Sequence, residues 1–123
     1  MANQRNILVV DDEEALRTVL SSELSGEGYH VETASDGDEA IAAIQKNSAF
    51  DLVLLDIKMP RVDGFEVLKF IKQTVPQIKV IMLTAFADLK NAIESKKLGA
   101  EDFISKPYDL VDLLTTIERV LSE

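Results

Sequence analysis

Five polar residues of this sequence, each at or just after the end of an apolar run, have side chains that could carry out phosphoryl chemistry together. They are Asp11, Asp12, Asp56, Thr84 and Lys106. Carboxylates held close together repel one another, by roughly 3 kcal/mol for two at about 5 Å and an effective dielectric near 20. A hard divalent cation removes this penalty, and Mg²⁺ binds through one or two carboxylates together with water and phosphate oxygens. The three aspartates therefore predict a Mg²⁺ site if the fold brings them together.

Asp56 is the candidate nucleophile of this set. No histidine, cysteine or serine is placed as a rival, and the single histidine, His30, lies near the start of an expected strand. The hydroxyl of Thr84 and the ammonium of Lys106 suit phosphate oxygens. Asp56 can then be a metal ligand, a nucleophile or both, and the set indicates phosphoryl transfer to a carboxylate. The alternative, that the aspartates only cap helices or open turns, is disfavoured because all five groups converge.

The apolar runs before these residues predict buried strands. Residues 7–10, 52–55 and 80–83 are continuously apolar, which is typical of strands covered on both faces. Shorter strand-like pieces lie at 31–34 and around 103–104. Between and after them, apolar residues recur at helical spacing in five stretches: Leu16, Val19, Leu20 and Leu24; Ala40, Ile41 and Ile44; Val67, Leu68 and Ile71; Leu89, Ala92 and Ile93; and Leu110, Leu114, Ile117 and Leu121.

This alternation of five strands and five helices predicts a single-domain α/β fold, a doubly wound parallel sheet with helices on both faces. Because parallel strands point the same way, their polar end residues gather at the carboxyl edge, where open α/β sheets bind ligands. Asp63 with Glu66 predicts the start of the third helix, Asp109 caps the fifth, and Gly99 suits a helix C-terminus. The fourth helix has the weakest apolar stripe, which favours a mobile element.

Composition narrows the remaining possibilities. The 123 residues suit one domain over residues 1–123, and a hydrophobic fraction of 46% can fill a core of that size. The sequence has no cysteine, no apolar N-terminal segment of the secretory type and no apolar run that could cross a bilayer. We therefore expect a cytoplasmic protein without membrane contact. A net charge of −9 disfavours direct contact with nucleic acid.

Four segments resemble the receiver domain of two-component response regulators, of the chemotaxis-regulator type. They are "ILVVDDE" at 7–13, "LVLLDIKMPRVDGFEVL" at 52–68, "IMLTA" at 81–85 and "GAEDFISKP" at 99–107, and the resemblance covers essentially the whole chain. It implies a flavodoxin-like five-stranded sheet with strand order 2-1-3-4-5. It also implies a cis peptide bond between Lys106 and Pro107.

The resemblance assigns a role to each of the three aspartates named above. Asp56 would accept a phosphoryl group from the phosphohistidine of a sensor histidine kinase or a histidine phosphotransfer protein. Asp11 and Asp12 would hold Mg²⁺ together with Asp56 and the backbone carbonyl of Lys58. The domain would then be a phosphoacceptor that slowly loses its phosphate, and not a conventional enzyme.

The resemblance further implies a switch. Lys106 would contact the phosphoryl group, Thr84 would hydrogen-bond it, and the space that Thr84 leaves would admit Phe103, the family's switch aromatic. This change would alter the surface of the fourth helix, fifth strand and fifth helix, which would bind an effector, an output domain or a second copy. Lys58 and Phe86 stand where the family tunes hydrolysis, and the bulky Phe86 predicts slow self-dephosphorylation. The alternative is that both are ordinary loop residues.

The main alternative function is a phosphohydrolase with an aspartate nucleophile, of the haloacid dehalogenase-like type. That chemistry wants a second acid two residues after the nucleophile, where this chain has Lys58, and the chain is too short for the usual cap. A nucleotide-binding switch is weaker still, since the sequence has no G-x-x-x-x-G-K-[ST] loop. A scaffold independent of phosphorylation would not need all five site residues. The sequence leaves open whether the chain acts alone or belongs to a larger regulator.

Overall fold

Five parallel strands form one sheet in the order β2-β1-β3-β4-β5. The computed structural model describes residues 4–84 and 89–123. Its strands are β1 (Asn6–Val10), β2 (His30–Ala34), β3 (Leu52–Asp56), β4 (Lys79–Thr84) and β5 (Asp102–Ser105). The predicted doubly wound sheet and the implied strand order 2-1-3-4-5 are both confirmed.

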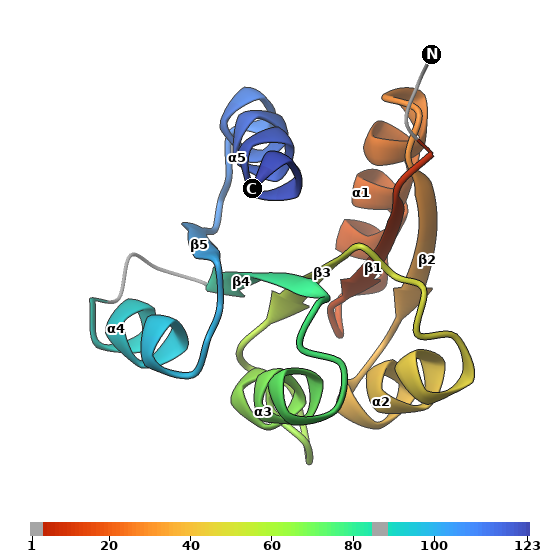
Figure 1. The fold of residues 1–123 in the computed structure, drawn as a ribbon. Coiled ribbons are helices and arrows are strands. Elements are labelled where there is room, and N and C mark those ends of the chain that lie inside the picture. The colour runs from red at the N-terminus through yellow and green to blue at the C-terminus, as the bar shows by residue number, and fades with distance from the viewer. Residues whose placement is uncertain (1–3, 85–88) are drawn as a thin grey trace.

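The helices cover both faces of this sheet. They are α1 (Glu14–Gly26), α2 (Gly37–Lys46), α3 (Gly64–Thr74), α4 (Leu89–Lys97) and α5 (Leu110–Ser122). Helices α1 and α5 lie on one face, and α2, α3 and α4 lie on the other (Figure 1). None of the helices in the described ranges combines the length and the apolar character needed to cross a lipid bilayer.

Local signals at the helix ends act as the sequence predicts. The side chain of Asp63 accepts a hydrogen bond from the N–H of Glu66 at the start of α3, and Asp109 accepts one from the N–H of Val111 at the start of α5. Each contact satisfies a backbone donor that has no partner within the helix. Gly99 follows α4 with a φ of 104°, the left-handed conformation that glycine adopts most easily.

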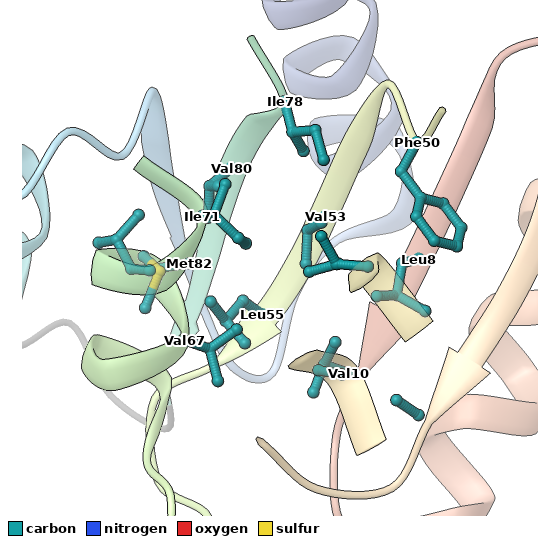
Figure 2. Packing of buried hydrophobic residues seen from close by; sticks show 14 of the residues in the cluster. Leu8, Val10, Phe50, Val53, Leu55, Val67, Ile71, Ile78, Val80 and Met82 are labelled. Atoms are coloured by element: carbon teal, nitrogen blue, oxygen red, sulfur yellow. The ribbon is translucent and has the colours of Figure 1, made fainter. Parts of the chain in front are cut away.

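Side chains of the central strands alternate between two hydrophobic cores, one on each face of the sheet. Leu8, Val53 and Val80 belong to the core on the first face, together with Val67 and Ile71 of α3 (Figure 2). The second core contains the alternate strand residues and the inner faces of α1 and α5: Ile7, Val9, Leu52, Leu54, Ile81, Leu83, Leu20, Leu24, Leu113, Ile117 and Val120. The continuous apolar runs therefore belong to strands buried on both faces, as predicted.

The buried faces predicted for two helices, α1 and α5, were partly wrong. Val19 of α1 is 49% exposed, because the buried residues Leu20 and Leu24 set the inner face and Val19 lies about 100° from Leu20 around the helix. In α5 the fully buried residues are Leu113, Ile117 and Val120, and of the predicted stripe only Ile117 is among them.

Helix α4 has few buried residues. Its buried side chains among the described residues are Ala92 and Ser95, whereas Ile93 of the predicted stripe is exposed. The hydroxyl of Ser95 is satisfied within the helix by the carbonyl of Asn91, at 2.8 Å. The weak apolar stripe predicted for this helix is thus confirmed.

Candidate functional site

Three carboxylates meet at the carboxyl edge of the sheet. Asp11 directly follows β1, Asp12 comes next, and Asp56 ends β3. One oxygen from each lies within 4.8 Å of the others. Strands β1 and β3 are hydrogen-bonded neighbours with Val10 opposite Leu55, so the residues that follow this pair come together. We call Asp11, Asp12 and Asp56 the acidic cluster.

The members of the acidic cluster differ in exposure. Asp11 is 0% exposed and Asp56 is 6% exposed, whereas Asp12 is exposed to solvent. The Oδ1 atom of Asp11 accepts a hydrogen bond from the backbone N–H of Glu13 at 2.9 Å. Charged groups with this degree of burial need a partner of opposite charge or a metal ion.

Lys106 supplies part of the opposite charge. Its Nζ lies 2.7 Å from Oδ2 of Asp11 and 3.6 Å from Oδ1 of Asp56. The backbone N–H of Lys106 donates to the carbonyl of Thr84 at the end of β4, and the Lys106–Pro107 peptide bond is cis, as the resemblance implied. Burial opposes the charge on Lys106, but the hydrogen bond that Lys106 donates to Asp11 and the charges of Asp56 and Asp11 outweigh it and raise the pKa of Lys106.

The carboxyl group of Asp56 is difficult to ionise. Burial and the negative charge of Asp11 raise its pKa from the ordinary value of 3.8 to about 6, and Asp12 adds to this rise. The charge of Lys106 and a hydrogen bond from the backbone N–H of Lys58 lower the pKa but do not cancel the rise. Without a metal, Asp56 is therefore protonated in about half of the molecules near pH 6.

The other predicted site residues differ in how closely they approach Asp56. Thr84 is buried at the end of β4, the strand next to β3, one residue beyond the position opposite Asp56. Lys58 contacts Asp56 through its backbone, and its side chain is exposed. Phe103 lies opposite Met82 on β5, half-buried against the first core. Phe86 falls outside the described residues.

Gly64 is a site residue that lies within the receiver-like segment 52–68 but has no role predicted from the sequence. Its N–H donates to the carbonyl of Ile57 at 2.8 Å. A Cβ at this position would lie 2.3 Å from the carbonyl oxygen of Asp56. Only glycine therefore allows the start of α3 to approach the end of β3 this closely. The Asp63-Gly64 pair was the available signal, since such a pair often marks a tight turn.

Two arginines near the site were also missed. Nη1 of Arg17 donates to the carbonyl oxygen of Asp11 at 2.7 Å. Arg61, which has a φ of 65°, pairs with Asp36 at 3.0 Å and with Asp38 at 3.4 Å, and so ties the loop after β3 to the start of α2. Nothing in the sequence pattern indicated these contacts, because each depends on how separate loops meet.

The acidic cluster fits a hard divalent cation. Its three carboxylates place oxygens within 4.8 Å of one another, and carboxylate oxygens are the ligands that Mg²⁺ prefers in proteins. In the described part of the chain, Lys106 is the one basic side chain that forms an ion pair with these carboxylates. Three carboxylates and one ammonium leave an excess of two negative charges when all groups are ionised.

A family model of the response regulator receiver domain matches residues 7–118. The chain belongs to this family. It is 41% identical to the transcriptional regulatory protein ZraR of Salmonella typhimurium, over 95% of this chain and 26% of ZraR. It is 40% identical to the probable transcriptional regulator ycf27 of Cyanophora paradoxa, over 97% of this chain and 49% of that protein. The receiver chain thus spans about a quarter to a half of these relatives.

The chain also matches solved receiver structures, and the match covers nearly the whole length of both chains. Chemotaxis protein CheY4 of Vibrio cholerae is 36% identical, with a TM-score of 0.89 over 96% of this chain and 99% of CheY4. The receiver domain of NtrX from Brucella abortus is 40% identical, with a TM-score of 0.88 over 94% of this chain and 98% of that domain. The predicted family and function class, a receiver domain of two-component signalling, are confirmed. A receiver is not a classical enzyme, and the disfavoured phosphohydrolase alternative gives way to it.

Proposed function

We propose that this receiver accepts a phosphoryl group on Asp56 from the phosphohistidine of a sensor histidine kinase or a histidine phosphotransfer protein. Asp11, Asp12, Asp56 and the backbone carbonyl of Lys58 would hold Mg²⁺. The observation that carries the proposal is the acidic cluster itself, with three carboxylates within 4.8 Å of one another and Lys106 beside two of them. Such an excess of negative charge lowers the stability of the fold unless a bound cation neutralises it, and perturbed charges of this kind often mark functional sites.

The transfer step requires an ionised Asp56. One carboxylate oxygen forms a bond to phosphorus while the bond between phosphorus and the donor imidazole nitrogen breaks. The electron pair of the broken bond stays on that nitrogen, which takes up a proton. Held by Asp11, Asp12, Asp56 and the Lys58 carbonyl, Mg²⁺ would supply positive charge that favours the ionised carboxylate and stabilises the phosphoryl oxygens.

Lys106 and Thr84 are the protein groups that stabilise the phosphoryl group in this proposal. The Nζ of Lys106 lies 3.6 Å from Oδ1 of Asp56, and a mobile ammonium with three donors can follow charge from the carboxylates to the phosphoryl oxygens. The hydroxyl of Thr84 can donate a hydrogen bond from the adjacent strand. Donors fixed near the developing charge are the main source of catalysis in such sites.

We further propose that Thr84 and Phe103 couple the site to the surface formed by α4, β5 and α5. Three features support this. Phe103 is half-buried, so an inward position would add to its burial. Among the residues of helix α4 whose burial is described, only Ala92 and Ser95 are buried, and Arg119 of α5 pairs with Asp102 of β5. This surface would bind an effector, an output domain or a second copy of the receiver, and DNA contact would belong to another domain.

Lys58 and Phe86 are proposed to set the lifetime of the phosphorylated state. The side chain of Lys58 is exposed, two residues after Asp56, at the position where a hydrolase would carry its second acid. The shielding role of Phe86, and with it slow self-dephosphorylation, stays a prediction that the phosphate lifetime would check. A cytoplasmic location of the 1–123 receiver domain stays a prediction too.

Intact-mass spectrometry after incubation with acetyl phosphate and Mg²⁺ tests the proposal. Wild-type protein is expected to gain one acid-stable, base-labile phosphate, and Asp56→Asn to gain none because an amide oxygen is a poor nucleophile. Replacing Mg²⁺ with EDTA should abolish the gain. Equal labelling of Asp56→Asn would contradict the proposal, and continuous release of inorganic phosphate without a labelled intermediate would favour a hydrolase.

A further inference from the structure

We infer that Arg17 is a positioning residue for the metal site, because it holds the peptide that joins Asp11 to Asp12. The inference rests on the proposed Mg²⁺ site and concerns a residue that lies outside it. Arg17 is half-buried in the first turns of α1, and its Nη1 donates to the carbonyl oxygen of Asp11 at 2.7 Å. The hydrogen bond therefore runs from the helix back to the loop that carries two of the three carboxylates.

Asp11 is fixed by contacts on all its polar groups. Its N–H donates to the carbonyl of Ala34 at the end of β2, at 3.2 Å. Its carboxylate accepts from the N–H of Glu13 and from Lys106. The remaining polar group is the carbonyl, and Arg17 occupies it.

The carbonyl of Asp11 belongs to the same planar peptide unit as the nitrogen of Asp12. A hydrogen bond to that oxygen therefore fixes the plane from which the Asp12 side chain departs. Asp12 itself is exposed, so its carboxylate has little packing to hold it in place. Arg17 is well placed to supply this restraint before a metal binds, and a ligand held in its binding position loses less entropy on binding.

The local structure of α1 leaves this task to Arg17. The N-cap residue Glu13 makes no side-chain capping hydrogen bond in the described part of the chain. The start of α1 therefore lacks the aspartate cap found at α2, α3 and α5. The contact from Arg17 to Asp11 is therefore a hydrogen bond that joins the first turns of α1 to the loop where an aspartate cap is absent.

Arg17 acts on the site as a hydrogen-bond donor more than as a charge. Its contact with the loop is to a neutral carbonyl, and its positive charge also faces Glu39 at the start of α2. Glu39 in turn accepts hydrogen bonds from the N–H and the hydroxyl of Ser35, each at 2.8 Å. The charge of Arg17 thus acts on Glu39, but its hydrogen bond is made to the loop after β1, and its removal would free that loop.

Calorimetric Mg²⁺ titrations of four proteins test the inference: wild type, Arg17→Met, Arg17→Lys and Arg5→Met. Arg5 is a matched control, because it also donates to a backbone carbonyl, that of Leu121, but it does so far from the acidic cluster. Loss of a residue that orients a metal ligand typically weakens metal binding by about 10-fold or more. Arg17→Met should therefore raise the Mg²⁺ dissociation constant about 10-fold, Arg17→Lys should restore part of the affinity, and Arg5→Met should match wild type.

A second readout separates positioning from folding. With acetyl phosphate, the Mg²⁺ concentration for half-maximal phosphorylation of Arg17→Met should rise, while the rate at saturating Mg²⁺ stays near wild type. Arg17→Gln takes the place of the methionine variant if that variant does not fold in EDTA, because the shorter side chain also fails to reach the carbonyl. Wild-type Mg²⁺ affinity in the tested variant would overturn the inference, whatever happens to its melting temperature. Absence of Mg²⁺ binding by wild type would instead overturn the proposed metal site, and the inference with it.

Discussion

Two clusters of lysine and carboxylate lie at opposite ends of the same sheet, and they differ in charge balance. At the carboxyl edge, Lys106 lies among the three carboxylates of the acidic cluster. At the other end, near the starts of β4 and β5, Lys72 of α3 pairs with Glu101 at 3.2 Å. The side chains of Lys72 and Glu101 are 17% and 19% exposed, and that of Lys106 is 19% exposed, so burial of the lysines does not separate the clusters.

The Lys72–Glu101 pair is complete by itself. Lys72 also donates to the carbonyl of Ile78 at 2.9 Å, and Glu101 accepts from the N–H of Val80 at 2.7 Å. One positive charge meets one negative charge, and backbone groups satisfy the remaining hydrogen-bonding capacity. The pair therefore joins α3 to β4 and β5 and has no surplus charge with which to bind a ligand.

The acidic cluster has the surplus of negative charge that the Lys72–Glu101 pair lacks. Lys106, its ion-pair partner among the described residues, cannot neutralise three carboxylates, and burial together with the charge of Asp11 raises the pKa of Asp56. The comparison shows that a lysine beside one carboxylate forms a balanced structural pair, whereas a lysine beside a cluster of three carboxylates leaves negative charge that can bind a cation. Each of the following predictions changes that balance at one of the two ends.

The largest effect is expected for Asp56→Asn. One pKa unit corresponds to about 1.4 kcal/mol, so a rise from 3.8 to about 6 represents up to about 3 kcal/mol. Because the folded-state pKa is the higher one, ionised Asp56 destabilises metal-free protein above pH 6, and the penalty vanishes as pH falls below 3.8. In EDTA at pH 8, Asp56→Asn should therefore unfold at higher urea than wild type, by up to about 3 kcal/mol.

The pH dependence provides the control for this prediction. Between pH 8 and pH 4 the difference in unfolding free energy between Asp56→Asn and wild type should shrink, most steeply between pH 6 and pH 4. A difference that stays constant over this range would show that the amide acts through packing and not through the loss of a charge.

A smaller effect of opposite sign is expected for Lys72→Met. Removing one partner leaves Glu101 half-buried with an uncompensated charge, which should lower the unfolding free energy by about 2 kcal/mol at pH 7. Urea unfolding in EDTA measures it.

Glu101→Gln in the Lys72→Met background is the matched control. Its amide oxygen can still accept from the N–H of Val80, and the unpaired charge is gone, so most of the lost stability should return. A double variant as unstable as Lys72→Met would contradict the view that charge balance stabilises this end.

The smallest change in stability is expected for Asp12→Asn. Because Asp12 is exposed, solvent screens its repulsion with Asp56, and metal-free stability should change by less than about 1 kcal/mol. Its oxygen still belongs to the acidic cluster, so thermal stabilisation by added Mg²⁺ should be much weaker than in wild type. Melting curves with Mg²⁺ and with EDTA measure both effects, and full stabilisation of Asp12→Asn by Mg²⁺ would exclude Asp12 from the proposed metal site.

The sequence was sufficient for the features that depend on local pattern. Continuous apolar runs predicted strands buried on both faces, and the positions of Asp11 and Asp56 at strand ends predicted that they would meet. Parallel strands turn a position along the chain into a position along the sheet edge, so this step needed no knowledge of side-chain contacts.

The remaining features depend on contacts between distant residues. No sequence pattern indicated that Asp11 is buried and Asp12 exposed, since the two residues are adjacent and chemically identical. The partner of Lys106 lies 95 residues away, and that of Lys72 lies 29 residues away. In α5, residues 113 and 114 are both leucine, and only packing against the sheet decided that Leu113 is the buried one.

The close approach of Gly64 to the carbonyl of Asp56 has a consequence for how this receiver tolerates variation. Every other amino acid at this position would push the backbone of Asp56 away from its neighbours, even though the glycine has no side chain to contribute. A map of tolerated substitutions should therefore show intolerant positions beyond the acidic cluster itself. Gly64 should be among the least tolerant of them, although it has no side chain.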